Sequence, residues 1–131
     1  MLPNTINVTT ETLPFEVSAR KYLKARFVTI TCTDLGDRFD ILYHFDRDYE
    51  LFNLRLSLGK GETLPSISGI YFAAAIIENE LKDLFGIPLK DLALDYGGRF
   101  LLAEGAPVAP QRKPDQPPAP AADATQKGPV C

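Results

Sequence analysis

Polar and apolar residues alternate along most of the chain between residues 27 and 58, in three stretches that short turns separate. The residues on the apolar side are Val28, Ile30 and Cys32 in the first stretch, Phe39, Ile41, Tyr43 and Phe45 in the second, and Phe52, Leu54, Leu56 and Leu58 in the third. This alternation predicts an antiparallel meander with one buried face. Ile6 and Val8 alternate with polar residues in the same way and predict a short edge strand.

Apolar residues recur at helical spacing in a first segment, residues 9–26. Thr12 suits the N-cap, Pro14 suits the first turn, and Phe15, Ala19 and Tyr22 form the predicted apolar stripe. Four basic residues follow near the end of the helix, where its dipole favours positive charge. They are Arg20, Lys21, Lys24 and Arg26, and we interpret them as a solvated helix face.

A second helix is predicted over residues 66–85, with Ser66 or Ser68 as its cap and Gly86 as a left-handed end. Its apolar stripe consists of Ile70, Ala74, Ile77, Leu81, Leu84 and Phe85. Because a sheet with one apolar face needs a covering layer, this stripe should pack on the sheet. The predicted fold class is α+β, with an antiparallel sheet of three to four strands covered by two helices.

The opposite face of this second helix carries Phe72 and Ile76 beside Asn79 and Asp83. A large apolar pair on an outer face indicates burial against something. Another protein or the chain's own segment 89–104 would each provide it. On the flank of the helix, Glu78 and Lys82 are spaced for an i,i+4 ion pair.

Composition changes sharply after residue 104. Seven of the eleven prolines lie from Pro107 onward, and this part holds no apolar residue larger than valine. Such a segment buries too little surface to offset the entropy of ordering. We therefore divide the chain into a folded domain, 1–104, and a flexible, disordered Pro/Ala-rich tail, 105–131. The tail would be a dispensable extension or a tether that lies over a partner.

Charge and hydropathy exclude several classes of function. A net charge of −3 gives no basic face for nucleic acid. No apolar run approaches the roughly 20 residues of a membrane span, and the first residues lack the pattern of a signal peptide. We therefore expect a cytoplasmic protein. With two cysteines and one histidine, the chain lacks the four ligands that an iron–sulfur cluster or a structural zinc site requires, and a disulfide between Cys32 and Cys131 is disfavoured in that compartment.

Candidate catalytic groups are few. His44 stands between Asp40 and Asp46 without the further partners that acid–base or nucleophilic work requires. The turn at 59–61, Gly-Lys-Gly, lacks the spacing of a phosphate-binding loop.

The remaining cluster is Glu78, Glu80 and Asp83, since neighbouring carboxylates perform general acid–base catalysis or pair with arginines of a partner. We predict a non-catalytic domain with an interaction surface. A small enzyme that uses these three carboxylates, and an adaptor that binds through its proline-rich tail, remain alternatives.

Three pieces of the chain resemble the thirty-kilodalton subunit of respiratory complex I and its relatives in membrane-bound nickel–iron hydrogenases. They are YHFDRDYELFNLRLSL from residue 43, TLPSISGIYFAAAIIENELKDLFGI from residue 63, and RFLLAE from residue 99. The positions that match the family signature are Pro65, Ser66, Glu78, Glu80, Asp83, Phe85, Gly86 and Ile87.

The chain also departs from this pattern. Ile76 occupies an expected aromatic position, and Asn79 stands where the family has arginine. The segment after the second helix is shortened, and the tail replaces a longer terminal piece. In these respects the chain is most similar to the small accessory subunit of energy-converting hydrogenases.

The resemblance implies a cofactor-free accessory subunit of a membrane-associated oxidoreductase, of the energy-converting hydrogenase or NADH:quinone type. It would dock on the large catalytic subunit and the iron–sulfur small subunit of the peripheral arm, at the cytoplasmic side of the membrane. Iron–sulfur clusters, and in the hydrogenase case nickel and iron, would reside in those partners. We expect Phe72 and Ile76 to anchor the partner and these residues to position it by charge: Glu78, Glu80, Asp83 and Arg99.

Overall fold

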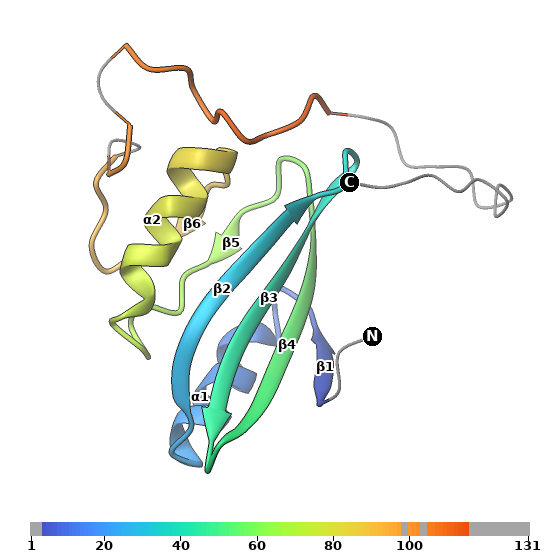
Figure 1. The fold of residues 1–131 in the computed structure, drawn as a ribbon, viewed down its shortest axis with the longest axis vertical. Coiled ribbons are helices and arrows are strands. Elements are labelled where there is room, and N and C mark those ends of the chain that lie inside the picture. The colour runs from blue at the N-terminus through green and yellow to red at the C-terminus, as the bar shows by residue number, and fades with distance from the viewer. Residues whose placement is uncertain (1–3, 98–99, 103–104, 116–131) are drawn as a thin grey trace, which may run out of the picture.

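A computed structural model of the chain describes residues 4–97, 100–102 and 105–115. These residues form a mixed four-stranded sheet, two helices and a small two-stranded parallel sheet (Figure 1). The elements in chain order are β1 (Thr5–Val8), α1 (Leu13–Tyr22), β2 (Arg26–Asp34), β3 (Arg38–Arg47), β4 (Glu50–Gly59), β5 (Leu64–Pro65), α2 (Ala74–Phe85) and β6 (Leu89–Lys90). The α+β class is confirmed.

The antiparallel meander is also confirmed. The strands of the large sheet lie in the order β1-β4-β3-β2, and β2, β3 and β4 pair antiparallel. Asp48 and Tyr49 join β3 to β4 with φ angles of 52° and 67°, the left-handed pair of a two-residue hairpin turn. The edge strand β1 pairs parallel to β4, so the sheet is mixed rather than wholly antiparallel. This happens because α1 carries the chain back between β1 and β2 before the meander begins.

The prediction for Val28 is wrong, because a β-bulge changes the phase of β2. Phe27 pairs with Phe45, but Thr29 pairs with His44, so Val28 is an extra residue on its strand. The bulge leaves Val28 47% exposed. Phe27 takes the inward position instead, where its ring meets the ring of Phe45 edge-on at 6.0 Å.

The predicted stripe of α1 is also wrong. The helix forms, but it buries Leu13 and Val17, while Phe15 is 73% exposed and Tyr22 is exposed as well. Leu13 and Val17 lie one turn apart on one face, and Phe15 lies about 200° around the helix from Leu13. Thr12 occupies the N-cap position without a capping bond into the helix. Its hydroxyl instead accepts a hydrogen bond from the backbone amide of Thr9.

The second helix starts later than predicted. It begins at Ala74 after a series of turns, so Ser66 and Ser68 do not cap it. Most of its predicted stripe does face the core: Ala74 and Leu81 are buried, and Ile77 and Phe85 pack against the core cluster, as does Ile70 in the preceding turn. Leu84 is half-buried and is not part of that cluster.

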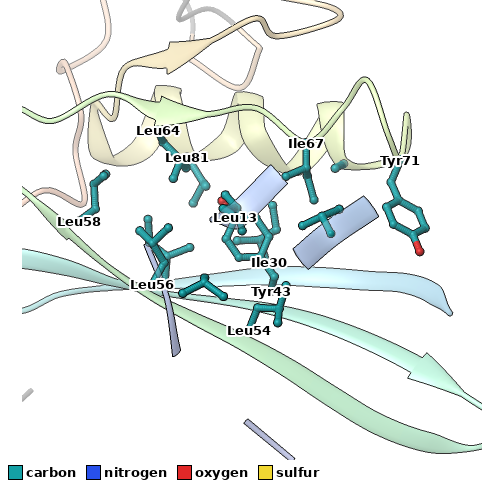
Figure 2. Packing of buried hydrophobic residues seen from close by; sticks show 14 of the residues in the cluster. Leu13, Ile30, Tyr43, Leu54, Leu56, Leu58, Leu64, Ile67, Tyr71 and Leu81 are labelled. Atoms are coloured by element: carbon teal, nitrogen blue, oxygen red, sulfur yellow. The ribbon is translucent and has the colours of Figure 1, made fainter. Parts of the chain in front are cut away.

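Figure 2 shows Leu64, Ile67 and Leu81 opposite Leu54, Leu56 and Tyr43 of the sheet. The helix ends at Gly86 with a φ of 68°, as predicted.

The first part of the proline-rich segment lies against the domain. The amide of Gln111 donates to the carbonyl of Leu84 at 2.8 Å, and the guanidinium of Arg112 lies 5.5 Å from the centre of the Phe39 ring. The amide of Lys113 donates to the carboxylate of Asp34 at 2.6 Å. The described contacts therefore continue past residue 104 to Asp115. The division at 104 stays a prediction, and the rest of the tail, with Cys131, lies outside the described residues.

Lys60 fastens this segment to the sheet. Its side chain is 8% exposed, and its Nζ lies 3.1 Å from Asp34 and 3.2 Å from Asp115. The same Nζ donates to the carbonyl of Lys113 and lies 4.9 Å from the centre of the Phe39 ring. The ammonium thus has carboxylate and carbonyl partners, which a nearly buried charge requires.

We predict that Leu81→Ala lowers the free energy of unfolding by about 2–5 kcal/mol, because it leaves a cavity between α2 and the sheet. Urea unfolding followed by circular dichroism measures the change. Phe15→Ala is the control, and its cost should stay within about 0.5 kcal/mol because that ring is exposed. Equal losses for the two variants would contradict the assignment of the core.

The Asp34 carboxylate should make stability depend on pH. Burial alone would raise its pKa, but the hydrogen bonds from the amides of Lys113 and Gly36 and from Lys60 lower the pKa below the ordinary value of 3.8. A carboxylate whose pKa falls on folding stabilises the native state above its unfolded pKa. This stabilisation is lost as the pH drops through the folded pKa.

The test compares the unfolding free energies of the parent chain and Asp34→Asn from about pH 7 to about pH 2. We expect the parent to be more stable near neutrality and the difference to disappear at the acidic end. Asp48→Asn, at the exposed hairpin turn, is the control. A difference between the parent and Asp34→Asn that does not change with pH would disprove the role of this carboxylate.

Candidate functional site

Phe72 and Ile76 form an exposed apolar pair at the N-terminal end of α2, which we call the α2 patch. Phe72 is 65% exposed and Ile76 is 42% exposed. The preceding Tyr71 faces inward, where its hydroxyl donates to the carbonyl of Ala25 at 2.7 Å. Its ring also lies 5.5 Å from that of Phe45. Tyr71 therefore fixes this turn with Phe72 on the surface.

The C-terminal part of the same helix face is covered by residues 91–97 and 100–102, which follow β6 and which we call the return segment. Asn79 is fully buried, and its side-chain amide donates to the carbonyl of Leu94 at 2.7 Å and accepts from the amide of Tyr96 at 3.0 Å. The buried carboxylate of Asp83 accepts from the amide of Leu101. The chain's own segment therefore covers Asn79 and Asp83 but leaves the α2 patch exposed, and burial of that patch against another protein stays a prediction.

Glu78 is fully buried and links α2 to the segment that follows β5. Its Oε1 accepts from the hydroxyl of Ser66 at 2.6 Å, and its Oε2 accepts from the amide of Ile67 at 2.8 Å. Ser68 extends the network, since its hydroxyl lies 2.7 Å from that of Ser66 and accepts from the amide of Ala93 at 2.8 Å. Burial raises the pKa of Glu78, and these hydrogen bonds oppose the rise.

The predicted i,i+4 pair with Lys82 does not form. Because Glu78 points inward, Lys82 pairs instead with Asp95 at 2.8 Å. The sequence predicted Ser66 or Ser68 as the helix cap, and no local pattern revealed that the partner of these serines is a carboxylate well inside the helix.

The three carboxylates of the predicted cluster therefore do different things. Glu78 bonds to the segment after β5, Asp83 bonds to the return segment, and Glu80 is half-buried. Within residues 4–97, 100–102 and 105–115, no group of three or more His, Cys, Asp or Glu residues has the arrangement of a metal site. The remaining charged candidate, Arg99, lies outside the described residues.

Most positions of the family signature that the structure describes support the fold. Phe85 meets the ring of Phe39 edge-on at 6.1 Å, Gly86 supplies the left-handed helix end, and Ile87 is fully buried. A side chain at Gly86 would also press on Ala109, 3.2 Å away. The signature therefore marks how α2 is held and ended.

His44 is part of a hydrogen-bond row across the sheet. Its Nδ1 lies 2.7 Å from the Asn53 amide oxygen, and its Nε2 lies 3.1 Å from the Thr31 hydroxyl. The two acids that flank it in sequence bind arginines instead, Asp40 with Arg55 and Asp46 with Arg26. This arrangement gives the imidazole neutral neighbours and no carboxylate to orient it.

The sequence placed Tyr43 on the buried side of its strand and Asp83 in the carboxylate cluster, but it did not indicate that each has a polar atom buried without a partner in the described part of the chain. The hydroxyl of Tyr43 is buried without a hydrogen-bond partner among the described residues, and its burial raises its pKa well above the ordinary value. One carboxylate oxygen of Asp83 is also buried without a hydrogen-bond partner among the described residues.

In the part of the chain that is described, neither helix has the length and apolar character needed to cross a membrane.

Comparison with known proteins gives a consistent result. The family described as "Respiratory-chain NADH dehydrogenase, 30 Kd subunit" matches residues 7–120. An NADH-quinone oxidoreductase subunit of Jannaschia sp. (strain CCS1) is 37% identical over 83 residues, which cover 55% of this chain and 40% of that protein. The corresponding NADH-quinone oxidoreductase subunit of Cereibacter sphaeroides (strain ATCC 17029 / ATH 2.4.9) is 31% identical over 107 residues, covering 76% of this chain and 54% of that one.

A solved structure shares the fold. A chain of the membrane-bound sulfane sulfur reductase (MBS), described as an archaeal respiratory membrane complex, superposes with a TM-score of 0.68 at 15% identity, covering 78% of this chain and 64% of that chain. The chain spans about half the length of the curated relatives it matches. Because the family match extends over most of the sequence, and the signature residues hold and end α2, the chain belongs to the thirty-kilodalton subunit family of the respiratory-chain NADH dehydrogenase.

Proposed function

We propose that this chain is a non-catalytic docking subunit of a membrane-associated oxidoreductase complex, and that the α2 patch is the surface that binds the neighbouring subunit. The observation that carries the proposal is the exposure of Phe72, in the turn before α2, and of Ile76, on a helix whose other residues are buried or half-buried. Exposed apolar side chains at a fixed position on a rigid helix provide contact area at a small entropic cost.

The chemistry of the helix supports docking over catalysis. A general acid or base must reach a substrate, but Glu78 and Asp83 are buried and bonded to the chain's own groups. These two carboxylates therefore act through the fold. Glu80 and Arg99 remain the charged candidates for direct contact with the partner.

The partners follow from the family. We infer that the chain contacts the large catalytic subunit and the iron–sulfur small subunit in the peripheral arm, on the cytoplasmic side of the membrane. The chain itself would bind no cofactor, and iron–sulfur clusters would reside in the partners. The name shared by the curated relatives favours an NADH:quinone complex. The shortened segment after the second helix keeps an energy-converting hydrogenase, with nickel and iron in its large subunit, as the second candidate.

We predict that Ile76→Asp abolishes co-purification of the complex with an affinity-tagged copy of this chain, because it places a charge in the apolar contact. Phe15→Asp, at an exposed apolar residue of α1, is the matched control and should retain the partners. Circular dichroism should show both variants folded. Full co-purification with Ile76→Asp would refute the patch assignment. If truncation after residue 115 then removed the partners, the adaptor alternative would hold.

A second experiment separates the structural carboxylate from the docking surface. We predict that Glu78→Ala lowers the unfolding free energy of this chain alone by about 1–3 kcal/mol, because the Ser66 hydroxyl and the Ile67 amide lose a buried acceptor. Glu80→Ala should change it by less than about 0.5 kcal/mol. An unchanged unfolding free energy in Glu78→Ala would contradict this structural role and would leave Glu78 as a candidate for contact with the partner.

A further inference from the structure

A second apolar surface lies between the end of α1 and the tip of the β3–β4 hairpin, and it shares no residue with the α2 patch. It is a pocket of about 230 Å³. Its walls are Ile6, Leu23, Ala25 and Phe52, with the arginines Arg20 and Arg47 beside them. Figure 1 shows the lower end of the sheet, where α1 and the hairpin approach each other.

The pocket exists because the apolar face of the sheet extends beyond the area that the helices cover. Phe52 continues the inward row of β4 toward the hairpin, but it is only half-buried, and Ile6 of β1 is 48% exposed. The helix α1 stops at Tyr22, and Lys24 turns the chain with a φ of 66°. That turn brings Leu23 to the surface beside the uncovered part of the sheet.

The two charged side chains that line the pocket are both arginines, and one of them has no ion pair among the described residues. Arg26 is bound to Asp46 through two hydrogen bonds of 3.0 and 2.7 Å. Arg20 lies 3.6 Å from Glu16. Arg47 is exposed, and among the ion pairs within the described part of the chain none includes it. An apolar pocket with an available guanidinium at its edge complements an apolar side chain next to a carboxylate.

We propose that this pocket binds a segment of a partner protein in which a leucine or phenylalanine side chain adjoins aspartate or glutamate. The apolar side chain fills the space between Leu23 and Phe52, and the neighbouring carboxylate pairs with Arg47. The evidence for this pocket is independent of the evidence for the α2 patch. Two separate contacts would fix the orientation of this chain on its partner, which one contact leaves free to rotate.

The test is a titration of the full chain, labelled with nitrogen-15, with a short capped peptide that places leucine and phenylalanine between two aspartates. We expect amide shifts at Ile6, Leu23 and Phe52, and roughly tenfold weaker binding to Arg47→Gln, which loses a charge-assisted bidentate contact. Arg38→Gln is the matched control and should bind as the parent does, because Arg38 does not line the pocket.

Two further peptides separate the two parts of the proposed ligand. Replacing the aspartates by lysines should abolish binding, and so should replacing leucine and phenylalanine by glycine. Binding of the lysine peptide as strong as that of the aspartate peptide would overturn the proposal, as would unchanged affinity in Arg47→Gln. Concentration-dependent shifts at the pocket without any peptide would assign it to a second copy of this chain and would also overturn it.

Discussion

The fold depends on a single constraint: the four-stranded sheet is apolar on one face and must be covered there. Phe39, Ile41, Tyr43 and Phe45 of β3 leave almost no surface exposed, so the covering layer is complete over the centre of the sheet. The inner side of α2 is used for this purpose, and its outer side must be satisfied in another way. The return segment covers the C-terminal part of that outer side, and the N-terminal part stays open at Phe72 and Ile76.

Buried charges determine where this cover sits. Apolar packing by itself is not directional, so it would tolerate small shifts of α2 along the sheet. Glu78 removes that freedom, because its two oxygens need the Ser66 hydroxyl and the Ile67 amide at fixed positions. Asp34 and Lys60 act in the same way at the other end of the sheet, where they hold the backbone of Lys113. A charge without these bonds would be costly to bury, so the positions of the donors and acceptors restrict where each segment can lie.

The bonds of these buried carboxylates give the family signature a structural role. A string of acids on a helix invites a catalytic interpretation, yet Glu78 and Asp83 satisfy backbone and hydroxyl donors of their own chain. Phe85 and Gly86 complete and end the same helix. Most of the signature therefore identifies a scaffold, while the two docking surfaces that we propose, at Phe72 and around Arg47, lie outside it. Function is carried by sites placed on a fold, and the fold alone does not specify them.

The sequence by itself determined the strands β3 and β4, the inner stripe of α2, its end at Gly86 and the family. These features repeat with a local period of two or 3.6 residues, or rest on the backbone freedom of one glycine. Only the tertiary structure decided the bulge at Val28, the inward face of α1 and the partners of Glu78 and Lys60. Each of these depends on a residue far away in sequence: the bulge on pairing with β3, and the buried charges on donors and acceptors that other segments bring to them. Periodicity records which side of an element is apolar, but it does not record what lies opposite, and that is where the candidate docking surfaces arise.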